Sequence, residues 1–267
     1  MAPQPADFRV FTRIPLAHIE NGRVSYFHSV SFRNFRGSFI CLSRIIKRSV
    51  TVAKRRTKSD QHKLAMRHLR KIDPVMRRVI DHVGPCTVTP ERDRFWMLVR
   101  SILSQQISTA AARTVRDRVV LLVESRSGSK SVTPESLLAL SVDELRGAGC
   151  SRRKAEYMLD LAAKVDHGDV ALGKIGRLSN EEVIETLVQV RGIGRWTAEM
   201  FLMFSLGRLD VFPVDDLGVR NAMLNLYELD QPVSHDDFRA IAEKWQPYAT
   251  IGSWYCWRSL ETDIPAE

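Results

Sequence analysis

The sequence predicts an all-α fold for residues 61–267, and three observations lead to this prediction. Helix-start signals recur along the segment, apolar residues return at helical spacing after them, and patterns typical of strands are few. The chain has 267 residues, of which 44% are hydrophobic, and this length can bury one good core or two small ones.

Residues 1–60 differ in composition from the rest of the chain. They contain 12 Lys or Arg against 3 Asp or Glu, whereas the remaining residues carry 28 of each. The whole net charge of +9 therefore belongs to this segment, and basicity is no evidence that the helical part binds nucleic acid. We expect a basic, disordered N-terminal extension. A mis-assigned start, a targeting peptide and a basic arm with nonspecific affinity for nucleic acid are the alternatives.

Two classes of protein are disfavoured by the composition. The longest apolar candidates, such as residues 38–43, are far shorter than the roughly 20 residues that a membrane helix needs. The four cysteines are too widely and irregularly spaced for a zinc site or an iron–sulfur cluster, and they stand at Cys41, Cys86, Cys150 and Cys256. We therefore expect no membrane association and no iron–sulfur cluster.

Two threonine–proline pairs indicate helix starts, because proline lacks the N–H that the first helical position leaves unpaired. Thr89-Pro90 precedes a segment with one apolar face, formed by Phe95, Trp96, Val99, Ile102 and Leu103. Thr133-Pro134 precedes a short segment whose leucines we expect inside, namely Leu137, Leu138 and Leu140. Residues 125–131 and 167–176 are predicted to be loops.

Two capping boxes mark further helices. In residues 141–144 and 179–182 a serine is followed three positions later by glutamate, and the two residues can satisfy each other's end amides. Apolar residues at helical spacing follow the second box, and Gly207 is a plausible C-terminal stop for the helical segment before it.

Gly192-Ile193-Gly194 is predicted to join two helices by a tight turn, with the second helix beginning near Arg195. Glycine permits the reversal and removes the Cβ that would block an approaching phosphate. The free amides of the second helix then face the anion, and Ile193 tucks between the helices. The alternative is a plain glycine-rich connection between two helices. Arg195, Thr197 and Ala198 follow the turn in register, and this favours the phosphate-binding interpretation.

A pair of carboxylates follows at another predicted helix start. Pro213 ends the preceding segment, and Asp215 and Asp216 come directly after it. Aspartate is a favoured helix cap, so the pair has a purely structural interpretation. The same position can hold an ionised carboxylate beside a sugar that develops positive charge. Glu199 and Asp210 are alternative candidates for the catalytic carboxylate, but the sequence around them defines their positions less well.

At these residues the chain resembles the helix-hairpin-helix DNA glycosylase superfamily, and most of all its alkylation-repair branch, the 3-methyladenine DNA glycosylase II or alkylbase group. The resemblance covers about residues 65–260. It implies a helix-hairpin-helix glycosylase fold with two helical lobes and an active site in the cleft between them. The hairpin would span residues 179–206, one lobe residues 90–210, and the other residues 61–90 with 211–260. Met200 stands where the bacterial type enzyme has a tyrosine.

The resemblance implies that Asp216, 22 residues past Gly194, is catalytic. The lyases of this superfamily carry a lysine where this chain has Trp196, which implies a monofunctional glycosylase that excises 3-methyladenine and 7-methylguanine with water. Its partner would be double-stranded DNA with damaged bases, and the protein would act as a monomer. The alternatives are a bifunctional or other-lesion glycosylase, a noncatalytic helix-hairpin-helix module, and a helical protein-interaction domain.

The resemblance also assigns the rest of the site. The base pocket would be formed by Trp196, Met200 and Trp254. Gln106, in the segment 104–108, would fill the gap left by the flipped base, and the amides of Gly192, Gly194 and Thr197 would bind phosphate. The carbonyls of Val188, Val190 and Ile193 would hold a Na⁺ or K⁺ ion, with no other cofactor required. The compartment would be the nucleoid region of a bacterial cytoplasm or a eukaryotic nucleus.

Overall fold

The structure is a computed structural model that describes residues 58–262 and Ile264, together with five short strands among the first 57 residues. The chain divides into two units, Met1–Thr57 and Lys58–Glu267. In the first unit, β1 (Ala17–Glu20), β2 (Arg23–Tyr26) and β5 (Val50–Thr51) form one antiparallel sheet in the order β1-β2-β5. A second antiparallel pair consists of β3 (Ser31–Arg33) and β4 (Phe39–Cys41).

These five short strands lie within the segment that the sequence predicts to be a basic, disordered extension. Glu20 pairs with Arg23, so only Asn21-Gly22 connects β1 to β2. Asn-Gly is the strongest short-range sequence signal for a two-residue hairpin, so the sequence contains a signal for the pairing of β1 with β2. The other residues of positions 1–57 lie outside the described residues, so the disordered extension stays a prediction.

Residues 58–262 are helical and contain no strand, which confirms the all-α prediction for this part of the chain. None of the described helices is long and apolar enough to cross a membrane. In chain order the α-helices are α1 (Lys58–Ile72), α2 (Pro74–Val83), α3 (Arg94–Ser104), α4 (Thr109–Ser127), α5 (Pro134–Leu138), α6 (Val142–Gly147), α7 (Arg152–His167), α8 (Asn180–Val188), α9 (Arg195–Phe201), α10 (Leu217–Leu226), α11 (His235–Glu243) and α12 (Ala249–Ser259). A 3₁₀ turn, η1 (Ile175–Arg177), precedes α8, and a π-helical stretch, η2 (Leu202–Leu206), continues α9.

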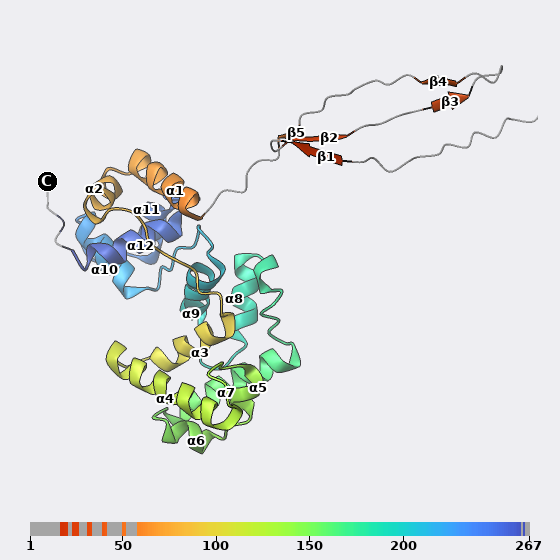
Figure 1. Ribbon diagram of the computed structural model, residues 1–267. Helices are drawn as coiled ribbons and strands as arrows, with labels where there is room; N and C mark the ends of the chain where they lie inside the picture. Colours follow the sequence, from red (N-terminus) through yellow and green to blue (C-terminus); the bar gives the residue numbers. More distant parts are fainter. Residues whose placement is uncertain are drawn as a thin grey trace, which may run out of the picture. The chain divides into compact units, whose positions relative to one another are not determined.

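The helices of the second unit enclose two buried apolar clusters. One cluster draws most of its residues from α3 to η2, and the other most of its residues from α1, α2, α10, α11 and α12, which gather at one end of this unit (Figure 1). Trp257 packs against both clusters. The second cluster therefore combines helices from the two ends of the described sequence, and Trp257 lies where the clusters meet.

Local capping fixes most helix starts. The boxes at Ser141 and Ser179 are both formed as predicted, since each serine accepts the amide of the glutamate three residues on and the glutamate side chain accepts the serine amide. Thr133 caps α5 as predicted, although its reciprocal partner is Ser136. Gly207 ends η2 with φ +67, a conformation that glycine adopts without steric cost.

Two expectations were wrong in detail. The helix expected at Thr89-Pro90 begins only at Arg94, and its cap is Asp93, whose side chain accepts the Trp96 amide at 2.9 Å. The backbone before it is held elsewhere, because the Glu91 amide donates to the carbonyl of Phe204 at 2.7 Å. Leu138, expected inside, is 41% exposed because it lies on the outer side of the one-turn helix α5.

Candidate nucleic-acid interface and active site

Helices α8 and α9 form a hairpin around the turn at Gly192 to Gly194. Gly192 has φ +83, and a Cβ at this position would overlap the ring of Tyr157, so the turn needs glycine for two separate reasons. Ile193 is 4% exposed and belongs to the first apolar cluster, so its side chain is buried. A Cβ on Gly194 would meet nothing within 4 Å, so the outer side of the turn is open.

The amides expected to bind phosphate lie at this open side. Gly194 is the N-cap of α9 and offers no side chain to the amides that follow it. The amides of Gly192, Gly194 and Thr197 find no acceptor within the described part of the chain. Unpaired amides at a helix N-terminus, together with the helix dipole, attract anions.

The loop between α3 and α4 touches the hairpin. The Gln105 side-chain amide donates to the Gly192 carbonyl at 2.8 Å, a contact for which the sequence gives no signal. The next residue, Gln106, has φ +56, a left-handed conformation that costs a residue other than glycine about 1 kcal/mol or more. Ile107 beside it is 40% exposed. The loop thus presents a strained glutamine next to the phosphate-facing turn.

Asp216 is the N-cap of α10 and is 8% exposed. Its Oδ1 accepts the amide of Val219 at 2.8 Å, and this capping bond fixes the carboxylate at the start of the helix. Two indole N–H groups complete its surroundings. Trp257 donates to Oδ1 at 2.9 Å, and Trp196 donates to Oδ2 at 2.8 Å. Three donors therefore hold the two oxygens in a fixed direction.

Trp257, and not Trp254, is the C-terminal aromatic residue that reaches Asp216. Trp254 packs edge-to-face on Tyr255, with ring centroids 4.9 Å apart, and it carries the Arg258 guanidinium 5.9 Å from its ring. A Cβ on Gly218 would stand 3.1 Å from the Trp257 ring and 3.2 Å from the Asp216 carboxylate. Glycine there leaves room for the indole to pack against the acid. Neither Trp254 nor Trp257 is among the described residues that line the cavity, so the pocket role expected for Trp254 stays a prediction.

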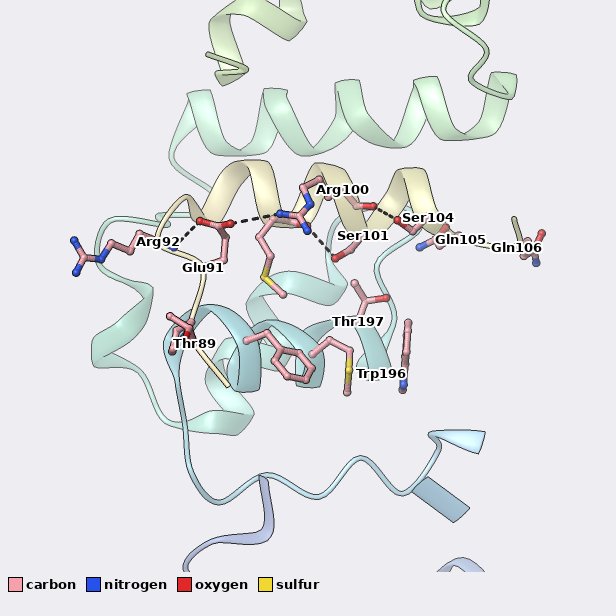
Figure 2. Close-up of a pocket in the computed structure, with 14 residues that line it drawn as sticks. Thr89, Glu91, Arg92, Arg100, Ser101, Ser104, Gln105, Gln106, Trp196 and Thr197 are labelled. Carbon is pink, nitrogen blue, oxygen red and sulfur yellow. Dashed lines mark hydrogen bonds and ion pairs between the residues drawn. The ribbon is translucent and has the colours of Figure 1, made fainter. Parts of the chain in front are cut away.

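A cavity of about 1050 Å³ opens between α3 and the helical stretch formed by α9 and η2 (Figure 2). Four of the residues expected in the site line it together, namely Gln106, Trp196, Thr197 and Met200. Trp196 is 43% exposed, and its indole N–H reaches Asp216. The tryptophan thus joins the cavity to the carboxylate.

The competing acids have other surroundings. Glu199 is 6% exposed, its Oε2 has no hydrogen-bond partner among the described residues, and burial raises its pKa to about 7. Arg195 opposes this rise from 3.7 Å. Asp215 is half exposed and faces His235 at 3.6 Å, and Asp210 accepts the Ala249 amide at 3.2 Å. None of these three acids is among the residues that line the cavity, and Asp216 is not among them either but is joined to the cavity through Trp196.

Metal-binding side chains are not clustered in the described part of the chain, where no group of three or more His, Cys, Asp or Glu could hold an ion. Three cysteines there, Cys86, Cys150 and Cys256, are buried and free, and burial raises the pKa of the first two thiols to about 11. The side chain of Cys41 lies outside the described residues.

The hairpin, the capped aspartate and the cavity together define a two-core helical protein of the helix-hairpin-helix class. The chain belongs to the HhH-GPD superfamily of base excision DNA repair proteins, whose family pattern matches residues 99–247.

Two curated relatives come from Schizosaccharomyces pombe. The protein named DNA-3-methyladenine glycosylase 1 is 34% identical over 196 residues, covering 72% of this chain and 85% of the relative. The alkylbase DNA glycosidase-like protein mag2 is 30% identical over 205 residues, covering 76% and 95%.

Solved structures show the same fold. The S. pombe 3-methyladenine DNA glycosylase Mag1 in complex with abasic DNA is 32% identical, with a TM-score of 0.65 over 76% of this chain and 100% of that one. A DNA-3-methyladenine glycosidase from Bacillus halodurans is also 32% identical, with a TM-score of 0.68 over 78% of this chain and 94% of that one.

Proposed function

We propose that this chain is a monofunctional DNA glycosylase that flips alkylated bases of the 3-methyladenine and 7-methylguanine type out of duplex DNA and releases them by hydrolysis. The observation that carries the proposal is the bond from Trp196 to Asp216. One side chain lines the cavity and also holds the carboxylate, so a base in the cavity places its sugar near the acid.

DNA binding rests on the hairpin. The amides of Gly192, Gly194 and Thr197 bind a backbone phosphate of the damaged strand, which positions the protein without reading sequence. Gln106 enters the duplex beside this phosphate and fills the gap, because flipping a nucleotide leaves an unstacked space at a cost of a few kcal/mol. The bond between Gln105 and Gly192 couples the filling loop to the phosphate contact.

The cavity receives the flipped base between apolar and aromatic walls. Trp196 and Met200 lie on one side of it, and the indole face attracts a cationic alkylpurine by about 0.5–2 kcal/mol. This preference is small, so a range of damaged bases would be accepted.

Asp216 stabilises the charge that develops when the bond between C1′ and the base nitrogen breaks. The departing base keeps the bonding electrons, the sugar becomes positively charged, and the carboxylate opposes that charge at short range. Water then adds to C1′ and loses a proton, which leaves an abasic site. A cationic alkylpurine departs as a neutral base, so the reaction needs no strong general acid.

The lysine required for a lyase reaction is not present at the cavity, since no described residue that lines it is a lysine and Trp196 occupies the position after the hairpin. The intermediate would therefore be captured by water and not by an amine.

The hairpin turn can also take a monovalent cation. The carbonyls of Val188 and Ile193 accept no hydrogen bond within the described residues, and that of Val190 accepts only the Ile193 amide at 3.1 Å. Backbone oxygens suit Na⁺ or K⁺, and the ion would add positive charge beside the phosphate. The protein would work as a monomer on damaged duplex DNA, in the nucleoid region or the nucleus according to the cell.

The test is the release of free bases from methylated duplex DNA, followed by chromatography, with borohydride trapping run in parallel. We expect 3-methyladenine or 7-methylguanine in solution, intact abasic strands and no trapped complex. Binding without release would indicate a noncatalytic module. Strand cleavage with a trapped complex would indicate a lyase, and release from oxidised or deaminated DNA alone would indicate another lesion class.

A further inference from the structure

The wall of the cavity carries an ion pair that the reaction described above does not use. Glu91 Oε2 lies 3.4 Å from Arg100 Nη1, each side chain is 41% exposed, and both residues line the cavity (Figure 2). The walls around the pair are largely apolar and include Met97, Met200 and Phe204. Glu91 is the only acidic residue among the described residues that line the cavity.

Glu91 is held rigidly at this place. Its Oε1 accepts the amides of Arg92 at 2.8 Å and Asp93 at 3.2 Å. Its backbone amide donates to the carbonyl of Phe204 at 2.7 Å, and its carbonyl accepts the hydroxyl of Ser205 at 3.2 Å. Arg100 projects from the second turn of α3 on the other side of the pair. Glu91 is therefore fixed at the wall of the space that a flipped base would enter, and Arg100 is paired with it there.

We propose that the Glu91–Arg100 pair sets the balance between cationic and neutral damaged bases in this cavity. This inference rests on the proposed function, because it takes the cavity as the site of the flipped base. With both charges present the wall is close to neutral, so it neither attracts nor repels a cationic alkylpurine strongly. The enzyme therefore also accepts neutral bases that fit.

The physical reason is the low screening inside a cavity that DNA closes. A unit charge a few ångströms from the base changes the relative binding of cationic and neutral bases by about threefold to tenfold at an effective dielectric constant between protein and water. Arg92 also lines the cavity but lies at its rim, with the guanidinium turned away from the pair (Figure 2). Its charge acts on bulk solvent and on DNA, not on the base.

The experiment compares single-turnover excision of 7-methylguanine, a cation, with that of hypoxanthine, a neutral base, in the same duplex sequence. Arg100→Gln leaves Glu91 unopposed, and we expect the cation-to-neutral rate ratio to rise about threefold to tenfold. Glu91→Gln leaves Arg100 unopposed, and the ratio should fall by a similar factor. The double variant should return the ratio to within about twofold of wild type. Both rates in the ratio are measured with the same variant, so an effect of that variant on general DNA affinity cancels.

Arg92→Gln is the matched control and should leave the ratio unchanged. Where hypoxanthine release is too slow to measure, the ratio of dissociation constants for the two duplexes, measured in an Asp216→Asn background, replaces the rate ratio. Shifts in the same direction for both single variants, or ratios within about twofold of wild type, would overturn the inference. Wild-type protein that releases no base at all would instead overturn the proposed function.

Discussion

Trp257→Phe tests how the carboxylate is positioned. The change removes the indole N–H that donates to Asp216 Oδ1 at 2.9 Å, while an aromatic ring remains to pack against Phe204, whose centroid lies 5.7 Å from that of Trp257. A hydrogen bond to a charged group contributes about 1.5–3 kcal/mol. In the variant, Oδ1 still accepts the Val219 amide at 2.8 Å and is not left without a donor. We therefore use the lower end of the range, about 1.5 kcal/mol, for the lost bond.

That value corresponds to a roughly tenfold lower rate constant if the bond is needed in the transition state. The assay is single-turnover release of 7-methylguanine, with DNA affinity measured by fluorescence anisotropy and stability by thermal unfolding. We expect a tenfold slower release with nearly unchanged affinity and a small loss of stability. Trp254→Phe is the matched control on the same helix and should leave the rate unchanged. A slower Trp254→Phe with a normal Trp257→Phe would refute this reasoning.

Three further predictions concern the hairpin and the buried acid beside it. Gly192→Ala should lower the melting temperature and weaken DNA binding together, because the new methyl group overlaps the Tyr157 ring at φ +83; thermal unfolding and anisotropy check this. Gly194→Asp should weaken DNA binding about tenfold without a stability change, since its Cβ meets nothing within 4 Å and its charge repels phosphate; the same two assays decide. Glu199→Gln should remove a pH dependence of stability. The pKa of Glu199 is raised to about 7 by burial, so its stabilising contribution is complete below about pH 4.5 and lost as pH rises through 7. Urea unfolding should therefore show the variant more stable than wild type by about 3 kcal/mol at pH 8, with no advantage at pH 4; equal stability at both pH values would contradict the prediction.

Much of the fold could be predicted because the signals are local. A serine and a glutamate three residues apart close a capping box within one helical turn, and this is why Ser141 and Ser179 start helices where expected. The Gly192 turn is similarly local, since its left-handed backbone requires glycine whatever surrounds it.

The errors come from contacts between distant segments. Thr89-Pro90 has the residues of a helix start, but the backbone at Glu91 pairs with Phe204, so α3 begins four residues after Pro90 at Arg94. The residues around Thr89 carry no sequence signal for that hydrogen bond. Helix propensity was overridden here by tertiary structure.

Whether Trp254 or Trp257 reaches Asp216 likewise depends on contacts between distant segments. Both stand on α12, and three residues of separation place them on nearly the same side of the helix. Which indole reaches Asp216 depends on how α12 docks on α10 and on the space left by Gly218. The ion pair of Glu91 and Arg100 could not be predicted for the same reason. Glu91 lies in the loop before α3 and Arg100 lies on α3, and no sequence motif links the two residues.

The most direct test of the account compares Asp216→Asn with Asp215→Asn in single-turnover release of 7-methylguanine. The two carboxylates are adjacent in sequence, but only Asp216 is buried and bound by Trp196 and Trp257, while Asp215 is half exposed beside His235. We predict that Asp216→Asn abolishes release with DNA binding retained, and that Asp215→Asn releases base within a few-fold of the wild-type rate. Near-normal release by Asp216→Asn would contradict the central claim.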